Sequence, residues 1–148
     1  MYIRRKEKVI ENRYLFRAKR IDNGEWVEGY LSYPFCTKKG NESYYFYAKD
    51  SLGFFCRCVV DASTICQCTG LKDKNDKLIF ENDIVSYWDS YSTENGLAEA
   101  DCIGKVVWDD ETISFQVTNR LSAESWEVLD DECSVVGNAI DNPELLEV

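Results

Sequence analysis

The feature that most constrains the fold is the spacing of short aromatic and β-branched runs between turn-forming residues. Strand-like runs alternate with clusters of Asp, Asn, Ser and Gly about every eight to twelve residues along the chain. Asp22-Asn23-Gly24 is the clearest such cluster, since it lies between the runs 14–20 and 25–31 and accepts the positive φ of a tight hairpin. The pattern predicts an all-β chain of mainly antiparallel short strands, arranged as a barrel or a sandwich.

The same reasoning places the other elements. A polar stretch rich in small residues, 89–100, predicts an exposed excursion. One short helix is expected within Ser122–Leu129, and another at the C-terminus, where Asn142-Pro143-Glu144 offers a cap, a first-turn proline and a first-turn acid. Further strands are predicted at 44–47, 54–60, 65–69, 84–88, 102–108, 113–117 and 134–137.

Charge is distributed unevenly along the 148 residues. The net charge is −10, yet residues 1–20 carry eight basic and two acidic side chains, a local charge of +6 against −16 for the rest. A basic segment on an acidic body can contact nucleic-acid phosphates, and it can also contact the acidic face of a second subunit. The candidate contact residues are Arg4, Arg5, Lys6, Lys8 and Arg13, with Arg17 beside them.

Cysteine content and hydropathy bear on the compartment. Seven cysteines, an odd number, fit free thiols of a reducing cytosol better than a disulfide framework. No stretch approaches the roughly 18 apolar residues of a membrane span, and Met1–Lys6 is charged without an apolar run behind it. We therefore expect a protein of a reducing cytoplasm that does not enter a membrane.

Two cysteine pairs, Cys56-x-Cys58 and Cys66-x-Cys68, form the sharpest candidate metal site. Four thiolates can bind tetrahedral zinc. However, sulfurs two residues apart on a strand are separated by about 7 Å, and zinc sites usually leave two to four residues between their cysteines. Small buried thiols on adjacent strands are the simpler interpretation.

Catalytic patterns are missing from the sequence. The chain has no histidine, so a cysteine nucleophile would lack its usual base, and no glycine-rich phosphate loop is present. The acidic clusters Asp109-Asp110-Glu111 and Asp130-Asp131-Glu132 lack the spacing of a calcium loop. We predict a protein that is not an enzyme and needs no cofactor.

Three segments of the sequence together resemble the YopX family, which is found largely in bacteriophages and prophages. They are Leu15–Leu31, Thr69–Val85 and Val135–Leu146, of which the second is the most specific. They occur in the family's order and bracket nearly the whole chain from Tyr14 onward. The resemblance implies an all-β fold with a small SH3-like barrel in the C-terminal part. It implies no activity, because the family as a whole has no assigned biochemical function.

The chain departs from the family where glycine is usual, at Asp76 and Asn82. Asp and Asn tolerate the left-handed backbone region best among non-glycine residues, so both turns should persist. Residues 1–13 lie outside the pattern and are predicted to form a basic N-terminal extension. We divide the rest into an N-terminal β lobe, 14–65, and a C-terminal SH3-like β-barrel lobe, 66–148, unless the two form one compact domain.

Together these observations predict a phage or prophage accessory protein that acts by binding a host or phage protein. The alternative is a nucleic-acid-binding module that uses the basic N-terminal residues, which the acidic body disfavours. Such an acidic protein can also imitate DNA on a basic host site. A homo-oligomer is expected, with residues 1–20 of one subunit on the acidic face of another.

Overall fold

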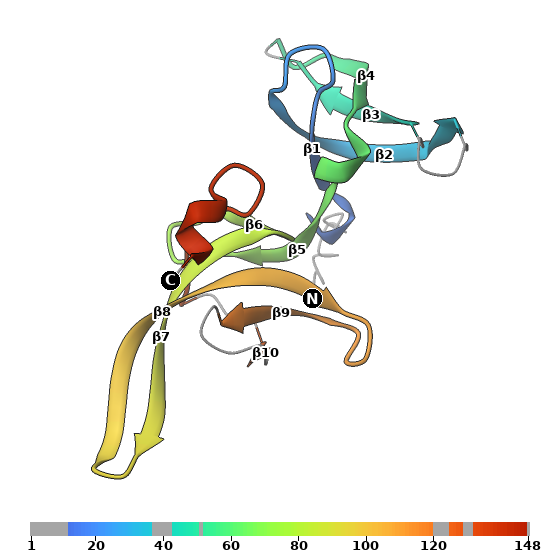
Figure 1. Ribbon diagram of the computed structural model, residues 1–148. Helices are drawn as coiled ribbons and strands as arrows, with labels where there is room; N and C mark the ends of the chain where they lie inside the picture. Colours follow the sequence, from blue (N-terminus) through green and yellow to red (C-terminus); the bar gives the residue numbers. More distant parts are fainter. Residues whose placement is uncertain (1–11, 37–42, 51, 120–124, 129–131, 148) are drawn as a thin grey trace, which may run out of the picture.

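The computed structural model describes residues 12–36, 43–50, 52–119, 125–128 and 132–147, which form two antiparallel sheets (Figure 1). The first sheet has the order β4-β3-β2-β1-β5-β6 and the second has the order β10-β9-β8-β7-β11. The first contains β1 (Phe16–Lys19), β2 (Trp26–Cys36), β3 (Ser43–Lys49), β4 (Phe55–Val60), β5 (Cys66–Lys72) and β6 (Leu78–Phe80). The second contains β7 (Asp83–Thr93), β8 (Gly96–Asp109), β9 (Ser114–Asn119), β10 (Ser125–Val128) and β11 (Ser134–Asn138).

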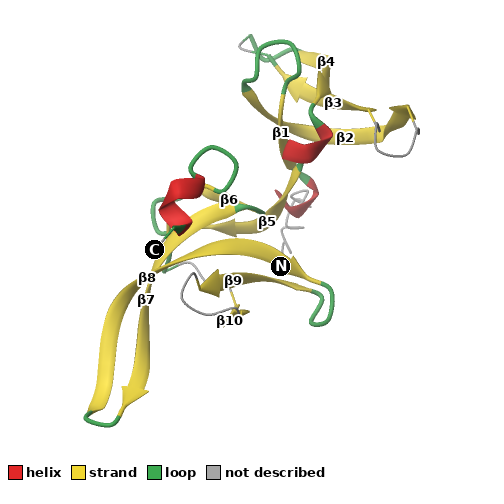
Figure 2. Cartoon of the chain, in the orientation of Figure 1, coloured by secondary structure: helices red, strands yellow, loops and turns green. Residues whose placement is uncertain are grey.

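The described residues contain no α-helix, which confirms the all-β prediction; the segments drawn red in Figure 2 are short 3-10 helices. The helical turns are the 3-10 elements η1 (Asn12–Tyr14), η2 (Ala62–Thr64) and η3 (Pro143–Leu146), the last at the predicted C-terminal position. The helix predicted within Ser122–Leu129 is wrong, because Ser125–Val128 forms β10 and pairs with β9. Pairing with the open edge of β9 outweighs the weak local preference for helix. No helix in the described segments is long and apolar enough to span a bilayer.

Turn chemistry shapes the hairpins as the sequence predicts. Gly24 adopts φ +69° between β1 and β2, and its amide donates to the Arg20 carbonyl at 2.9 Å. Asp76 and Asn82 adopt φ +65° and +66°, so both turns persist without glycine. Ile113, predicted to begin a strand, instead lies in the β8–β9 turn at φ +53°.

The N-terminal lobe buries one face of β1–β4. Ala18, Phe46, Cys58 and Val60 form its core, with Leu31 packed against them. Side chains alternate across a strand, so the neighbours of these residues point to the opposite face.

A second core lies under the C-terminal sheet. It contains Val85, Val106, Val117 and Cys133, and it also contains Ile79 from β6 of the first sheet. The predicted boundary between residues 65 and 66 stays a prediction, since β5 pairs with β1 while β6 packs into this second core. The strand orders of the two sheets do not establish a barrel, so the barrel and the SH3-like lobe also stay predictions.

The exposed excursion predicted at 89–100 takes the form of regular strands, because these residues form the distal part of the β7–β8 hairpin, in which 92–97 and Glu99 are exposed. Pairing is continuous from Ile84↔Lys105 to Thr93↔Gly96. Figure 1 shows this hairpin projecting from the body, at the end of the molecule away from β3 and β4. The sequence pattern missed it because a hairpin with two open faces needs no apolar alternation.

Candidate interaction surfaces

The predicted contact residues fall into three structural situations. Arg4, Arg5, Lys6 and Lys8 lie outside the described residues, and Arg13 lies in η1. Arg17, which the sequence groups with them, lies between the lobes and is largely covered. It therefore cannot serve as a surface contact for phosphates.

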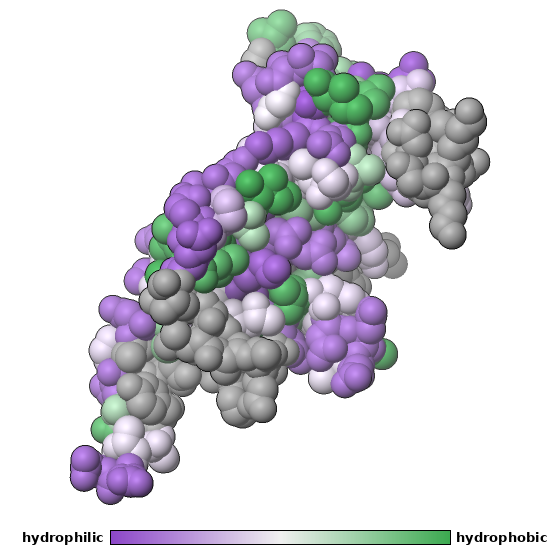
Figure 3. Space-filling model, viewed as in Figure 1, coloured by the Kyte–Doolittle hydropathy of each residue, from purple (hydrophilic) through white to green (hydrophobic). Residues whose placement is uncertain are grey.

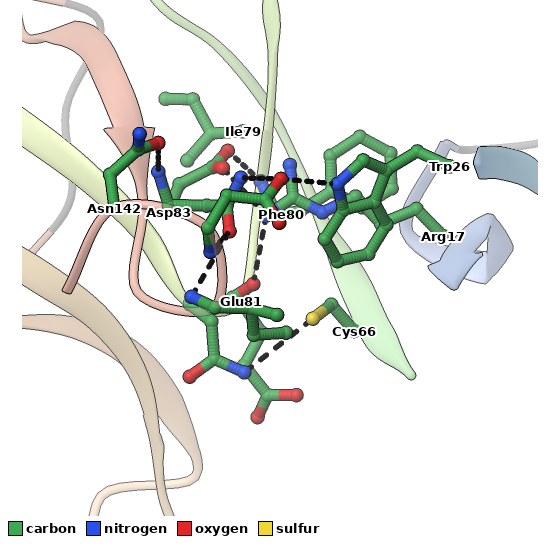
Figure 4. Close-up of polar contacts among 12 residues, drawn as sticks. Arg17, Trp26, Cys66, Ile79, Phe80, Glu81, Asp83 and Asn142 are labelled. Atoms are coloured by element: carbon green, nitrogen blue, oxygen red, sulfur yellow. Dashed lines mark hydrogen bonds and ion pairs between the residues drawn. The ribbon is translucent and has the colours of Figure 1, made fainter. Parts of the chain in front are cut away.

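Arg17 forms an ion pair with Asp83 at the junction of the lobes (Figure 4). Its Nη2 lies 2.7 Å from Asp83 Oδ1, and the two side chains are 12% and 1% exposed. The guanidinium carbon also lies 5.0 Å from the Trp26 ring centre and 4.9 Å from that of Phe80. Burial raises the pKa of Asp83, and Arg17 and the Phe80 amide oppose that rise. The pair joins β1 of one sheet to β7 of the other.

A second polar contact holds the C-terminal turn against the first sheet. Asp141, which follows β11, accepts hydrogen bonds from Lys19 Nζ at 2.5 Å and Trp26 Nε1 at 2.6 Å. These contacts lower the pKa of Asp141 to about 2. The junction is therefore built from residues that lie far apart in the sequence.

The four cysteines are not assembled into one site. Cys56 and Cys58 lie on β4 while Cys66 and Cys68 lie on β5, and β3, β2 and β1 separate these strands, so the prediction of adjacent strands is wrong. Cys58, Cys66 and Cys68 are buried, and burial raises the pKa of each thiol. In the described residues, no group of three His, Cys, Asp or Glu side chains is placed to hold a metal ion.

The outward face of β2, β3 and β4 is the first candidate surface, which we call the aromatic–cationic face. It is defined by Tyr30, Tyr47 and Phe55 with Lys49 and Arg57. The three rings are 44%, 45% and 67% exposed. Tyr47 is paired with Tyr30 on one side and with Arg57 on the other, and Lys49 is paired with Phe55. Rings and cations thus alternate on one side of a sheet whose other side is core.

This face continues into a groove between the first sheet and the C-terminal turn. The groove has a volume of about 820 Å³. Lys49 lies over the Phe55 ring, with Nζ 5.3 Å from its centre, and the Arg57 guanidinium lies 4.2 Å from the centre of Tyr45. The groove is lined by Trp26, Glu28, Tyr30, Tyr47, Phe55 and Asp141, among others.

The distal β7–β8 hairpin, Tyr87–Ile103, is the second candidate surface, which we call the acidic arm. β11 pairs with β7 only from Asp83 to Ser86, and β9 pairs with β8 only from Gly104 to Asp109. Beyond those residues the two strands pair, within the described segments, only with each other. The arm carries Asp89, Glu94, Glu99 and Asp101, and no Lys or Arg occurs between Lys77 and Lys105.

One side of the acidic arm combines apolar and acidic side chains. Trp88 is 61% exposed and Leu97 is 78% exposed. Because Trp88 is paired with Asp101 and Leu97 with Ser92, strand alternation places Trp88, Leu97 and Asp101 on the same side. Hydrophilic residues gather at the tip (Figure 3).

Net charge also differs between the part of the chain that forms the first sheet and the part that forms the second. Residues 1–80, which include the whole first sheet, carry fifteen Lys and Arg against ten Asp and Glu, a net charge of +5. Residues 81–148 carry two against seventeen, a net charge of −15. The positive charge of the first half comes from residues 1–20, at +6, because residues 21–80 carry seven Lys and Arg against eight Asp and Glu, as the sequence indicates.

The chain is similar to a known protein family and to known structures. A family model described as YopX protein matches residues 15–147, a range that contains the three segments noted in the sequence. The crystal structure of protein EF1440 from Enterococcus faecalis is similar, with 26% sequence identity and a TM-score of 0.49. That similarity covers 89% of this chain and 96% of the other. No curated protein matches the chain.

Proposed function

The chain belongs to the YopX family, and from that premise we propose that it is a phage- or prophage-derived accessory protein that binds a host or phage protein. The acidic arm is the observation that carries this proposal. The protein works in the bacterial cytoplasm and acts by occupying its partner, without catalysing a reaction.

Free strand edges make the arm suitable for pairing with another protein. From Tyr87 to Thr93 on β7, and from Gly96 to Ile103 on β8, the outer edge has no strand beside it among the described residues. Exposed edges present unpaired N–H and C=O groups that an extended segment of a partner can pair with.

Side chains on the arm define the chemistry of the partner. Trp88 and Leu97 supply exposed apolar surface, and Trp is among the residues that contribute most to protein interfaces. The arm's four carboxylates, unaccompanied by Lys or Arg, repel nucleic acid and attract a basic protein surface. The partner we propose is therefore a protein with a basic surface and an apolar pocket.

Binding is favoured over catalysis by the side chains present. The chain contains no histidine. Burial raises the pKa of Cys58, Cys66 and Cys68, which keeps these thiols protonated and poorly nucleophilic near neutral pH. Arg17 and Asp83 bind each other and so hold the two sheets together.

The test is affinity capture of the tagged full chain from host lysate, divided into nuclease-treated and untreated halves. We expect one defined protein in both halves, retained by wild type and lost with the double variant W88S/L97S. The matched control is Ile113→Ser, because Ile113 is an exposed apolar residue of the same sheet outside the arm. Equal retention by all three proteins would contradict the assignment to the arm.

We also propose self-association, since residues 1–20, at +6, and residues 81–148, at −15, favour contact between unlike segments of two copies. An untagged copy, co-expressed and retained on the tagged one, tests it in the same experiment. Absence of that copy would contradict self-association and leave the partner proposal standing.

A further inference from the structure

Beyond the protein partner of the arm, we propose that the aromatic–cationic face binds single-stranded nucleic acid, with bases stacked on Tyr30, Tyr47 and Phe55. This second binding site lies on the other lobe. It differs from the alternative drawn from the sequence, which relied on the N-terminal residues, because it uses ring and cation positions that the sheet fixes.

The rings form a platform that is already in place. Tyr30 and Tyr47 are directly paired across neighbouring strands, and such pairs have Cβ atoms about 4.5–5.5 Å apart. Behind them Phe46 and Ala48 are almost fully buried, so the strand that carries Tyr47 is anchored by the core. Every base has a π face, and stacking on exposed aromatic side chains therefore binds single strands with little dependence on sequence.

Two cations beside the rings remain available for phosphates. Arg17, Lys19 and Arg20 are each paired with an aspartate, respectively Asp83, Asp141 and Asp22. Lys49 and Arg57 are exposed, and in the described part of the chain neither makes an ion pair with a carboxylate. Their contacts are with the Phe55 and Tyr45 rings, which orients both charges along the stacking surface.

The acidic half of the molecule does not prevent this binding. The acidic arm projects at the end of the molecule away from β3 and β4 (Figure 1). Fields from exposed charges are largely screened beyond about 8 Å at physiological ionic strength. The repulsion that a net charge of −10 predicts is thus concentrated away from the face.

Unpaired bases suit the face better than a duplex does. A duplex hides its base faces inside the stack, so Tyr30, Tyr47 and Phe55 would gain no stacking from it. Glu28, on the same side of β2, is the acidic residue that opposes phosphate binding. A variant that lacks the Glu28 carboxylate should therefore bind a polyanion more tightly than wild type.

Fluorescence anisotropy with the full chain tests the proposal, using a labelled oligothymidine of about 20 nucleotides and a duplex of equal length. We expect Tyr47→Ala and Phe55→Ala each to weaken oligothymidine binding roughly tenfold, whereas Tyr47→Phe retains it. K49Q/R57Q should weaken binding and reduce the salt slope by about 1.4, since each phosphate contact on a single strand contributes about 0.7. Glu28→Gln should tighten it.

Matched controls keep the outcome interpretable. Trp88→Ala removes an equally exposed ring from the arm and should leave oligothymidine binding unchanged, and an unchanged unfolding midpoint shows that each variant is folded. Three results would overturn the inference: no oligothymidine binding at 50 mM salt, equal binding of the duplex, or loss of binding on deleting residues 1–13 while Tyr47→Ala binds like wild type. None of these affects the capture result with W88S/L97S, so the two proposals fail separately.

Discussion

The aromatic–cationic face and the acidic arm are both exposed β surfaces, but they differ in what supports them. The face lies on the back of a core that includes Ala18, Phe46 and Val60. The arm continues past the last residues that β9 and β11 pair with, and has no sheet or core beneath its distal part among the described residues. A supported face can hold rings at fixed spacing for a flat ligand, while an unsupported hairpin offers free backbone edges that can adapt to a protein.

The junction between the lobes keeps these surfaces apart. Arg17 with Asp83, and Lys19 and Trp26 with Asp141, connect the first sheet to the second. If the junction were lost, the aromatic–cationic face and the acidic arm would no longer be held at opposite ends of the molecule (Figure 1). The first tests therefore concern the residues that join the two lobes.

The largest effect on stability is expected from Asp83→Ala. It leaves Arg17 buried without its partner and removes the acceptor of the Phe80 amide, and breaking a buried ion pair typically costs about 3–5 kcal/mol. Urea unfolding followed by tryptophan fluorescence measures the loss.

The rescue is the double variant R17M/D83L, which replaces the pair by apolar side chains. Because burial raises the pKa of Asp83, its charge is costly in that site, and the double variant should recover most of the lost stability. A single substitution that costs less than about 1 kcal/mol would mean that water already reaches the pair.

Local chemistry determined which parts of this structure the sequence could predict. Asn23-Gly24 specifies its hairpin through two adjacent residues, and Asp76 and Asn82 specify turns through their tolerance of positive φ. The contact of Arg17 with Asp83 joins residues 66 positions apart, and no local pattern encodes it. The sequence predicts that 89–100 is exposed but does not predict that it forms strands, because both faces of the arm are open and the alternation that reveals a half-buried strand is absent.

The surfaces themselves were predictable only in part. Alternation within β2 and β3 indicates that Tyr30 and Tyr47 each share a strand face with polar residues. It does not indicate that the two strands are neighbours, or that Arg57 completes the row. That information resides in the register, which is set by long-range packing.

A smaller effect on stability is expected at the contact of Asp141 with Lys19 and Trp26, and this effect depends on pH. The pKa of Asp141 is lowered to about 2, so its contribution is fully present above the ordinary carboxyl pKa and is lost as pH falls through the folded value. Asp141→Asn should therefore lower stability at pH 6 by less than about 1 kcal/mol, because the contact is partly exposed.

Thermal unfolding of wild type and Asp141→Asn between pH 6 and pH 2 measures this difference. The two curves should converge toward pH 2, since the wild-type carboxylate is then being protonated. A constant gap across the whole range would show that Asp141 contributes through its shape and hydrogen bonds, without its charge.

The smallest effect on stability is expected from shortening the acidic arm. This change bears most directly on the difference between the arm and the aromatic–cationic face. Replacing residues 89–100 by Asn-Gly joins Trp88 to Asp101 through a two-residue turn at a position where the strands already pair. Residues 92–97 and Glu99 are exposed, so the free energy of unfolding should change by less than about 0.5 kcal/mol. The same variant should lose the captured protein yet bind oligothymidine like wild type.

A decrease of more than about 1 kcal/mol in the free energy of unfolding would instead place the arm in a buried contact, either within the chain or with a second copy. Dilution distinguishes these, because only contact with a second copy makes the loss depend on protein concentration.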